Sequence, residues 1–360
     1  MTTATRRAGG LEARLADLVA SYDARADTGP VQFCLASPSR DWRWEWPSPG
    51  GPRQYFLASI TKLYVAAIVM QLCAERRIDL DTAAAAYLGS PLMAGLHVLR
   101  GVDSSQRITV RELLSHTSGI ADYFEQRRAD GSSQFEDALR ADFAWTLDDV
   151  LRITRQMSPR FAPSTPGHAH YSDTNYQLLG ALIEAVTGTC YEQALQQRII
   201  EPLGLDQTYP FTTATLSRYA DIAPLLHGRK PVAIPRAMAS VRADGGVVST
   251  AREGLSFLQA FFGGALFPKT CLDSMQRPWR RIFYPLEYGM GIMRFALPRL
   301  LSPLRAAPVL VGHSGASGAV LFHAPDLDLY ISGTVNQIAA RSLAYRLMIS
   351  LVFACQDAWR

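Results

Sequence analysis

Ser59-Ile60-Thr61-Lys62 is the stretch that most constrains this chain of 360 residues. A serine hydroxyl is a weak nucleophile until a neighbouring group takes its proton. On a helix, residues three apart share a face, so Lys62 is expected beside Ser59. Apolar residues recur at three- and four-residue spacing after Ser59, and residues 59–76 contain no Gly or Pro. The pattern predicts a helix that carries a serine together with its own base.

Lysine is rare in this sequence. Lys62, Lys230 and Lys269 are the three lysines, whereas arginine is abundant. Arginine keeps its proton in proteins, but a desolvated lysine can act as a base. A lysine at position 62 therefore points to catalysis, although a single Ser-x-x-Lys match can also arise by chance in a chain of this length.

The composition is that of a folded globular protein, with 48% hydrophobic and 19% charged residues. The length allows one large domain or two lobes. The net charge of +4 comes from scattered basic residues, so we expect no nucleic-acid partner.

No apolar run is long enough to span a bilayer, so no membrane partner is expected. Charges interrupt the N-terminal residues, which predicts no secretory signal and a cytoplasmic protein. Five dispersed cysteines, at positions 34, 73, 190, 271 and 355, predict reduced thiols.

Strand signals gather near the two ends of the chain. Residues 11–22 are expected to be helical, and residues 31–36 and 42–46 to be strands. Later strands are expected at residues 245–248, 309–311, 319–323 and 327–335, before a closing helix at 337–358. The segments 312–318 and 325–326 would join the last strands as antiparallel hairpins.

The middle of the chain, residues 80–235, has mostly helical signals. Thr109 with Glu112, and Thr250 with Glu253, fit the capping-box pattern. A longer helix is expected from near Thr174 to just before Gly188. This order predicts an α/β (α+β) fold, in which residues 1–80 and 240–360 form one lobe and residues 81–239 an inserted helical lobe. A site is expected in the cleft between them.

Tyr171 and Asp173 lie just before the predicted helix, after the turn-forming pair Pro166-Gly167. A phenol near a lysine can relay a proton. The alternative is that Tyr171 only packs and Asp173 only caps the helix.

The segment Gly312-His313-Ser314-Gly315-Ala316-Ser317-Gly318 ends an apolar strand. Its three glycines would let a substrate approach the backbone, and His313 could donate a hydrogen bond or shuttle a proton. A plain glycine-rich hairpin is the alternative. The glycine spacing does not fit a Gly-x-Ser-x-Gly elbow, which disfavours a hydrolase of that fold.

Metal binding has little support in the sequence. His168 and His170 form an isolated pair, and no zinc-binding motif is present. His116 is expected to be a structural turn residue before Gly119.

Together, these segments resemble the serine β-lactamase and penicillin-binding-protein-like superfamily, in particular its class C branch with D,D-peptidases, family VIII esterases and acyltransferases. The family order Ser-x-x-Lys, Tyr-x-Asn and Lys/His-x-Gly is matched by Ser59/Lys62, Tyr171/Asp173 and His313/Gly315. The resemblance extends over about residues 30–335. It implies the β-lactamase/transpeptidase-like fold, with an antiparallel sheet flanked by N- and C-terminal helices and an inserted helical lobe.

The resemblance also implies a covalent mechanism without a cofactor or metal. Ser59 would form an acyl-enzyme with a small-molecule acyl substrate, and Lys62 and Tyr171 would share the role of general base. The backbone N–H groups of Ser59 and Ala316 would form the oxyanion hole beside Gly315. His313 would hold Lys62 and Tyr171 in order or bind a substrate carboxylate.

Two positions depart from the family pattern. Asp173 stands where Asn is common, and a carboxylate cannot donate to a substrate carbonyl as an amide does. A charged Asp173 near Lys62 would stabilise the ammonium form, which favours Tyr171 as the base. His313 stands where Lys is common, so the sequence offers no fixed charge there for an acidic substrate.

These features favour an esterase-type serine hydrolase or acyltransferase that acts on a small ester or amide. A β-lactamase or D-amino-acid-specific peptidase of the same fold is the first alternative. A non-catalytic ligand-binding or scaffold protein is the alternative of another class. Residues 122–142 and 277–281 are expected to line the cleft. The motifs do not indicate the acyl group, the leaving group or the oligomeric state.

Overall fold

An eight-stranded sheet forms one end of the molecule, in the strand order β10-β11-β12-β13-β14-β15-β1-β2, and every neighbouring pair is antiparallel. The computed structural model describes residues 3–46, 54–298 and 306–360. The strands of the sheet are β1 (Gln32–Ser37), β2 (Trp42–Trp46), β10 (Arg280–Phe283), β11 (Leu286–Tyr288), β12 (Met293–Phe295), β13 (Leu310–Gly315), β14 (Ala319–Ala324) and β15 (Leu329–Thr334). Strands from both ends of the chain therefore pair in one sheet.

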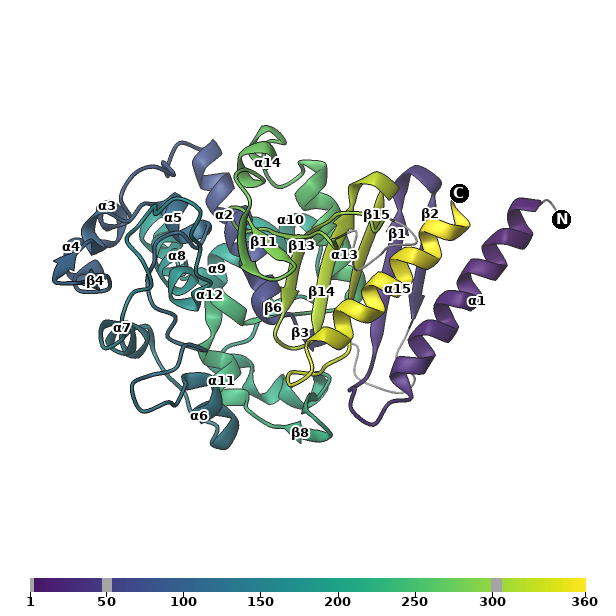
Figure 1. Cartoon of the computed structure of the whole chain (residues 1–360), viewed down its shortest axis with the longest axis horizontal. Coiled ribbons are helices and arrows are strands. Elements are labelled where there is room, and N and C mark those ends of the chain that lie inside the picture. Colours follow the sequence, from purple (N-terminus) through teal and green to yellow (C-terminus); the bar gives the residue numbers. More distant parts are fainter. Residues whose placement is uncertain (1–2, 47–53, 299–305) are drawn as a thin grey trace.

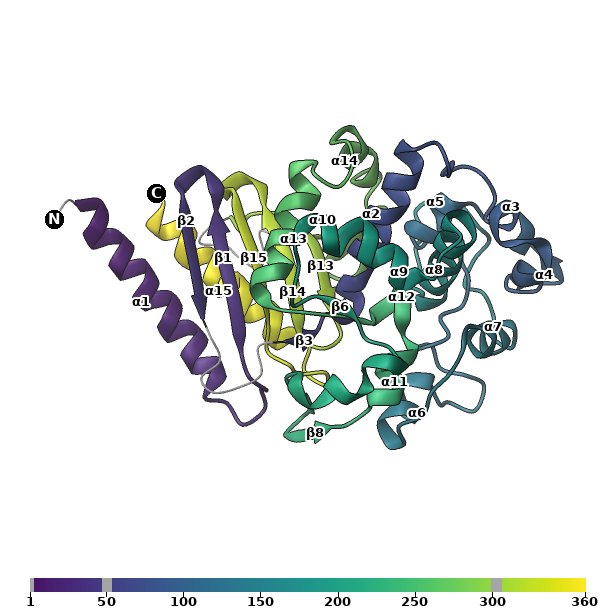
Figure 2. The same cartoon turned by 180° about the vertical axis from the view of Figure 1, so that it is seen from behind.

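Helices cover both faces of this sheet. α15 (Ser342–Ala358), with α1 (Thr3–Asp23) beside it, lies on one face, and α13 (Ala251–Gly263) lies on the other (Figures 1 and 2). β1 is buried along its whole length, which explains why its sequence does not alternate between apolar and polar residues. The edge strand β2 alternates, with Trp44 buried between more exposed neighbours.

The other end of the molecule is mostly helical (Figure 1). Its helices are α2 (Thr61–Ala74), α3 (Ala85–Leu88), α4 (Ser90–Met93), α5 (Val110–Leu114), α6 (Gln134–Arg140), α7 (Leu147–Arg155), α8 (Asp173–Thr187), α9 (Tyr191–Leu195), α10 (Glu201–Leu203), α11 (Pro235–Ser240) and α12 (Arg242–Gly245). α14 (Thr270–Met275) follows α13. Short strands complete it: β3 (Tyr55–Phe56), β9 (Val247–Ser249) and β6 (Tyr209–Pro210) pair as one small sheet, and β4 (Val98–Leu99) with β5 (Val102–Asp103) and β7 (Leu225–His227) with β8 (Lys230–Val232) form hairpins.

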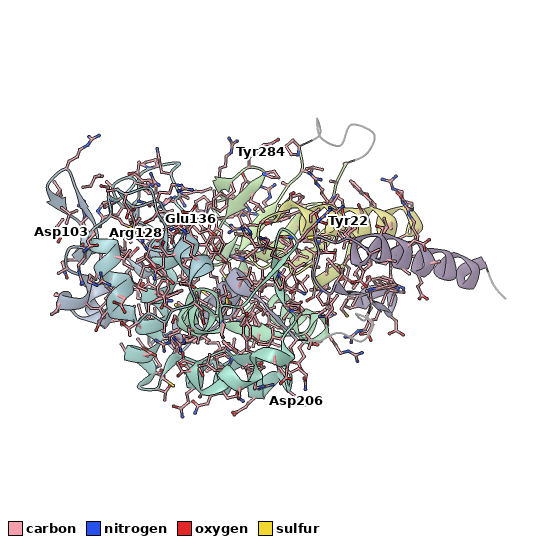
Figure 3. All side chains as sticks on the ribbon, turned by 90° about the horizontal axis from the view of Figure 1, so that it is seen from below. Tyr22, Asp103, Arg128, Glu136, Asp206 and Tyr284 are labelled. Carbon is pink, nitrogen blue, oxygen red and sulfur yellow. The ribbon has the colours of Figure 1, made fainter. Side chains whose placement is uncertain are left out.

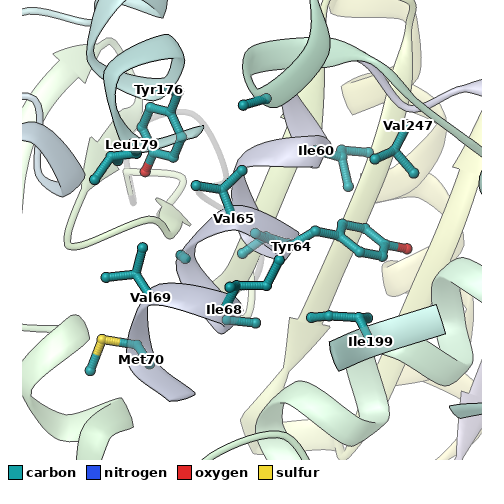
Figure 4. Packing of buried hydrophobic residues seen from close by; sticks show 14 of the residues in the cluster. Ile60, Tyr64, Val65, Ile68, Val69, Met70, Tyr176, Leu179, Ile199 and Val247 are labelled. Carbon is teal, nitrogen blue, oxygen red and sulfur yellow. The ribbon is translucent and has the colours of Figure 1, made fainter. Parts of the chain in front are cut away.

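α2 is the central helix and is hydrophobic on all sides, as expected for a helix surrounded by protein. Eleven of its fourteen residues are buried. Tyr64 stacks on Phe257 of α13 with ring centroids 3.6 Å apart, and Val65 points towards α8 (Figure 4). α2 therefore contacts both the helical end and β13, and the turn just before it, residues 58–60, also packs against β13.

The predicted fold class is confirmed, but some local predictions were wrong. The first helix begins at Thr3 rather than at residue 11. Thr250 accepts the Glu253 N–H as a helix cap, but the Glu253 carboxylate accepts hydrogen bonds from residues 207 and 208 instead of completing a capping box. β13 continues to Gly315, so the last hairpin turn is shorter than residues 312–318. The division of the chain near residues 80 and 240 stays a prediction.

No helix among the described residues is both long and apolar enough to cross a bilayer.

Candidate active site

Ser59 lies in a sharp turn between β3 and α2. A short 3-10 turn, Ala58–Ile60, precedes α2, so Ser59 is not in the α-helix itself. Ala58 has a φ of 47°, in the left-handed region that a residue with a side chain rarely adopts. The turn presents Ser59 to a cavity and still leaves it within reach of Lys62.

Lys62 is completely buried, and its Nζ contacts three oxygen atoms. Its Nζ lies 3.1 Å from Ser59 Oγ, 2.6 Å from the Asp244 carbonyl oxygen and 2.6 Å from Asp173 Oδ1. The same nitrogen lies 5.0 Å and 5.3 Å from the ring centroids of Tyr171 and Tyr176. The Lys62 nitrogen therefore faces three oxygen atoms and two aromatic rings.

Tyr171 precedes α8, as expected, and its hydroxyl is enclosed in the site. Burial, reinforced by the Asp173 carboxylate, raises the pKa of Tyr171 well above its ordinary value, and the neighbouring Ser59 hydroxyl opposes this shift. Within the described residues, the phenol makes no hydrogen bond of standard geometry. Tyr171 is therefore a neutral phenol next to the serine.

Three buried carboxyl groups surround the single ammonium of Lys62. Asp173 pairs with it directly, and Asp244 accepts hydrogen bonds at 2.9 Å from both Tyr123 Oη and Gln177 Nε2. Asp122 accepts backbone N–H groups of the loop that follows it and the N–H of Asp173, at 2.9 Å. Burial is the main reason that the pKa of each of the three is raised, to about 7 for Asp122.

His313 is buried on β13, and its ring centroid lies 6.4 Å from that of Tyr171. Its Nδ1 donates to the Ser314 carbonyl oxygen at 2.8 Å, and its Nε2 accepts from Tyr288 Oη at 3.0 Å. Burial and the Lys62 charge lower the pKa of His313 to about 3, so the ring is neutral. Among the described contacts, none is a hydrogen bond to Lys62 or Tyr171, and the side chain does not line the cavity. A role in binding a substrate carboxylate therefore finds no support.

His116 is a turn residue, as predicted, with a φ of 57°. Its Nδ1 accepts the backbone N–H of Ser172 at 3.1 Å and the side-chain amide of Asn175 at 3.2 Å. Burial lowers its pKa well below the ordinary value. A neutral His116 thus fixes the backbone on which Tyr171 and Asp173 stand.

The glycines of residues 312–318 allow close packing of chain segments, and Gly315 also lines the cavity beside Ser59. A Cβ on Gly315 would lie 2.2 Å from the Leu57 carbonyl oxygen, and one on Gly312 would lie 2.1 Å from the Leu321 carbonyl oxygen. Gly315 therefore lets β13 pack directly on the turn that carries Ser59. This contact brings Ala316 to the cavity beside Ser59, where its N–H is expected to complete the oxyanion hole.

A cavity of about 510 Å³ opens at Ser59. Tyr171, Asp173, Asp244, Gly315 and Ala316 share its wall with Ser59. Phe124, Glu125 and Phe135 confirm the prediction that residues 122–142 contribute to the cleft. Residues 277–281 do not line it, whereas residues 283–286 of the next segment do.

The histidine pair lies apart from these groups. His168 is exposed and bonds to the Pro166 carbonyl oxygen, and His170 bonds to Gln126. Within the described residues, no three His, Cys, Asp or Glu side chains are grouped so that they could hold a metal ion.

The Beta-lactamase family model matches residues 53–346, and the chain belongs to this family. It is 34% identical over 150 residues to penicillin-binding protein 4 of Amycolatopsis lactamdurans, covering 42% of this chain and 34% of that protein. Monacolin J acid methylbutanoyltransferase of Aspergillus terreus is 30% identical over 168 residues, covering 42% of this chain and 37% of that protein. Lovastatin esterase of Penicillium rubens is 28% identical over 181 residues, covering 47% of this chain and 43% of that protein. The chain thus matches between about a third and a half of the length of these relatives.

Solved structures extend the similarity to almost the whole chain. A D-stereospecific amidohydrolase from Streptomyces sp. is 27% identical, with a TM-score of 0.71 over 91% of this chain and 95% of that one. D-amino acid amidase from Ochrobactrum anthropi SV3 is 20% identical, with a TM-score of 0.79 over 98% and 100%, which supports the fold alone. The expected superfamily and fold are therefore confirmed.

Asp122, Asp244 and Tyr288 are site residues that sequence reasoning did not assign. Asp122 appeared only as the first residue of the segment 122–142. Each reaches the site through contacts between residues at least 25 apart in the sequence. A pattern of neighbouring residues carries no signal for such contacts.

Proposed function

We propose that this protein is a serine hydrolase or acyltransferase that cleaves small-molecule esters through a covalent acyl-Ser59 intermediate. The arrangement of Lys62 is the observation that carries the proposal. A completely buried lysine that donates to a serine hydroxyl is costly for the fold, because a buried charge needs good partners. Such a group is typical of a site that stabilises charge on the serine oxygen.

Lys62 acts as an ammonium ion and not as the general base. Its Nζ donates to Ser59 Oγ and to the Asp244 carbonyl oxygen and pairs with the Asp173 carboxylate at 2.6 Å, so in this arrangement Lys62 is a donor and not an acceptor towards Ser59. The positive charge instead stabilises the negative charge that develops on Ser59 Oγ during attack.

Tyr171 relays the proton. Ser59 Oγ forms a bond to the acyl carbon while its proton moves to Tyr171 Oη, and the proton of Tyr171 passes to the departing oxygen or nitrogen. No resident phenolate is required, which agrees with the raised pKa of this phenol. The N–H groups of Ser59 and Ala316 hold the oxyanion. Water then releases the acid, or an alcohol or amine takes the acyl group.

Esters are favoured over peptide-like amides because Asp173 cannot donate to a substrate carbonyl oxygen. The named activities of the acyltransferase and esterase relatives support this choice. Hydrolysis of a D-amino acid amide is the second candidate, because the Streptomyces amidohydrolase shares the fold at 27% identity over 91% of this chain.

The test is intact-protein mass spectrometry after brief exposure to p-nitrophenyl butyrate, with wild type and Ser59→Ala. The proposal expects a butyryl adduct and nitrophenol release from wild type alone. Decay of the adduct with and without added alcohol separates hydrolysis from transfer. Turnover of D-phenylalanine amide without ester turnover would favour the second candidate. No adduct with any of these substrates would favour a ligand-binding protein.

A further inference from the structure

The cavity beside Ser59 has two apolar walls that belong to different hydrophobic clusters. The sheet-side wall packs with the core between the sheet, α1 and α15, and consists of Leu286, Met293, Phe295, Leu297 and Tyr345. The helical-side wall packs with a separate core and consists of Phe124, Phe135, Leu225, Ile234, Met238, Val241 and Ile338. Ser59 lies on the same cavity as both walls.

Most charged groups on the cavity are already engaged by other parts of the chain. Glu125 and Arg341 form an ion pair at 2.5 Å across the cavity, and Asp173 pairs with Lys62. Asp244 accepts two side-chain hydrogen bonds. Arg346 is exposed to solvent. A charged substituent that packed against the apolar side chains of either wall would lose its hydration, which is unfavourable.

Tyr171 indicates which wall faces the leaving group. It packs against the sheet-side cluster, and its ring lies 5.7 Å from that of Phe283. Phe283 and Tyr284 are more than half exposed and stand on the same side of the cavity, where Tyr284 projects from the surface (Figure 3). Because the leaving group must reach the Tyr171 hydroxyl, it has to depart along the sheet-side wall.

We propose that the substrate is an uncharged ester with an apolar group on each side of the scissile bond. The helical-side wall binds the acyl chain, and the sheet-side wall binds the alcohol. This inference rests on the proposed acyl-Ser59 chemistry. A volume of about 510 Å³ is in the range of sites for small organic ligands, so both groups fit only if they are of moderate size.

The first measurement is kcat/KM for p-nitrophenyl acetate, butyrate and hemisuccinate, and for ethyl and butyl butyrate. Each buried methylene is expected to raise kcat/KM about fourfold, or about fifteenfold from acetate to butyrate and from the ethyl to the butyl ester. The hemisuccinate, with a charged acyl end, is expected to fall below the butyrate. A hemisuccinate rate equal to or above that of the butyrate would overturn the proposal.

Two matched substitutions assign the walls. Met238→Phe is expected to lower kcat/KM for p-nitrophenyl butyrate about tenfold and to change the acetate less than twofold. Leu297→Phe is expected to lower the rate for butyl butyrate about tenfold and to leave ethyl butyrate nearly unchanged. Equal effects of both variants on both series would refute the assignment, and thermal unfolding verifies that each variant is folded.

Binding to Ser59→Ala distinguishes a failure of this inference from a failure of the proposed chemistry. In calorimetry, N-butylbutanamide is expected to bind at least tenfold more tightly than the charged N-butylsuccinamate. If wild type forms no acyl adduct but this preference is found, the chemistry is wrong and the two apolar walls stand. If adducts form and the preference is absent or reversed, the proposal that the two walls select an uncharged substrate is wrong.

Discussion

Replacing Lys62 with methionine removes the one ammonium from a buried group of three carboxyls. At 2.6 Å, two unit charges attract by about 6 kcal/mol in an effective dielectric of 20. Desolvation of both ions offsets part of this attraction, and breaking a buried pair typically costs about 3–5 kcal/mol. Lys62→Met is therefore expected to lower the free energy of unfolding by about this amount.

The expected change in melting temperature follows from the chain length. With an unfolding entropy of about 2.1 cal/mol/K per residue, 360 residues give roughly 0.76 kcal/mol/K. A loss of 3–5 kcal/mol then corresponds to a decrease of about 4–7 °C. Calorimetry at pH 8 measures it, and Lys230→Met, on the exposed hairpin strand β8, is the matched control with an expected change below about 0.5 kcal/mol.

A double-mutant cycle with Asp173→Asn tests the reason for this loss. The pair Lys62→Met/Asp173→Asn is expected to be more stable than the sum of the single changes by at least about 1 kcal/mol, because it leaves no unpaired charge. In Lys62→Met the pKa of Asp173 rises further above its unfolded value of about 3.9, so the deficit is largest at alkaline pH and shrinks as the pH falls towards about 4. Additive effects, or a deficit that does not depend on pH, would refute the reasoning.

Three further predictions concern single residues. Tyr171→Phe is expected to lower kcat at least about a hundredfold in the ester assay. The melting temperature is expected to stay within about 1 °C, because the phenol has no standard hydrogen-bond partner among the described residues. A kcat above a tenth of wild type would exclude the relay. Gly315→Ala is expected to displace the Ser59 turn, because its Cβ would lie 2.2 Å from the Leu57 carbonyl oxygen, and to lower kcat/KM at least tenfold, whereas Gly263→Ala, with open space around it, keeps full activity. Equal activities of these two alanine variants would contradict the packing role of Gly315. The Asp122 carboxyl, with its pKa raised to about 7, contributes stability that is full below about pH 4 and is lost by about pH 7, so Asp122→Asn is expected to flatten the decrease in melting temperature between pH 4 and 7. An unchanged slope over that range would mean that another group causes it.

Sequence reasoning predicted the parts of the fold that depend on local patterns. The Ser59 helix, the helix after Tyr171 and the late strands all have periodicity or caps that neighbouring residues determine. The left-handed Ala58 and the close approach of Gly315 to the Leu57 carbonyl oxygen were not predicted. No pattern around residue 58 reveals a contact with a strand so far along the chain.

The site was predicted less completely, because its chemistry depends on tertiary contacts. Ser59, Lys62 and Tyr171 were found through spacing and family resemblance, and the structure brings them together. The hydrogen bond from Tyr288 to His313 is different, since the two residues are 25 apart and on different strands. That contact gives His313 a supporting position behind the cavity, where the sequence suggested direct contact with the reacting groups.

In the proposed mechanism, the aspartate at position 173 accounts for the division of roles between Lys62 and Tyr171. With an amide at that position, Lys62 would have no directly paired carboxylate. The Asp173 carboxylate makes loss of the Lys62 proton unfavourable, because it would then be left without its counter-ion in a buried site. The proposed mechanism therefore moves the proton of Ser59 through a group that carries no charge before or after the step. Tyr171 meets this condition when it gives up its own proton as it accepts the proton of Ser59. Burial raises the pKa of Tyr171, which favours this relay over a mechanism that needs a deprotonated Tyr171.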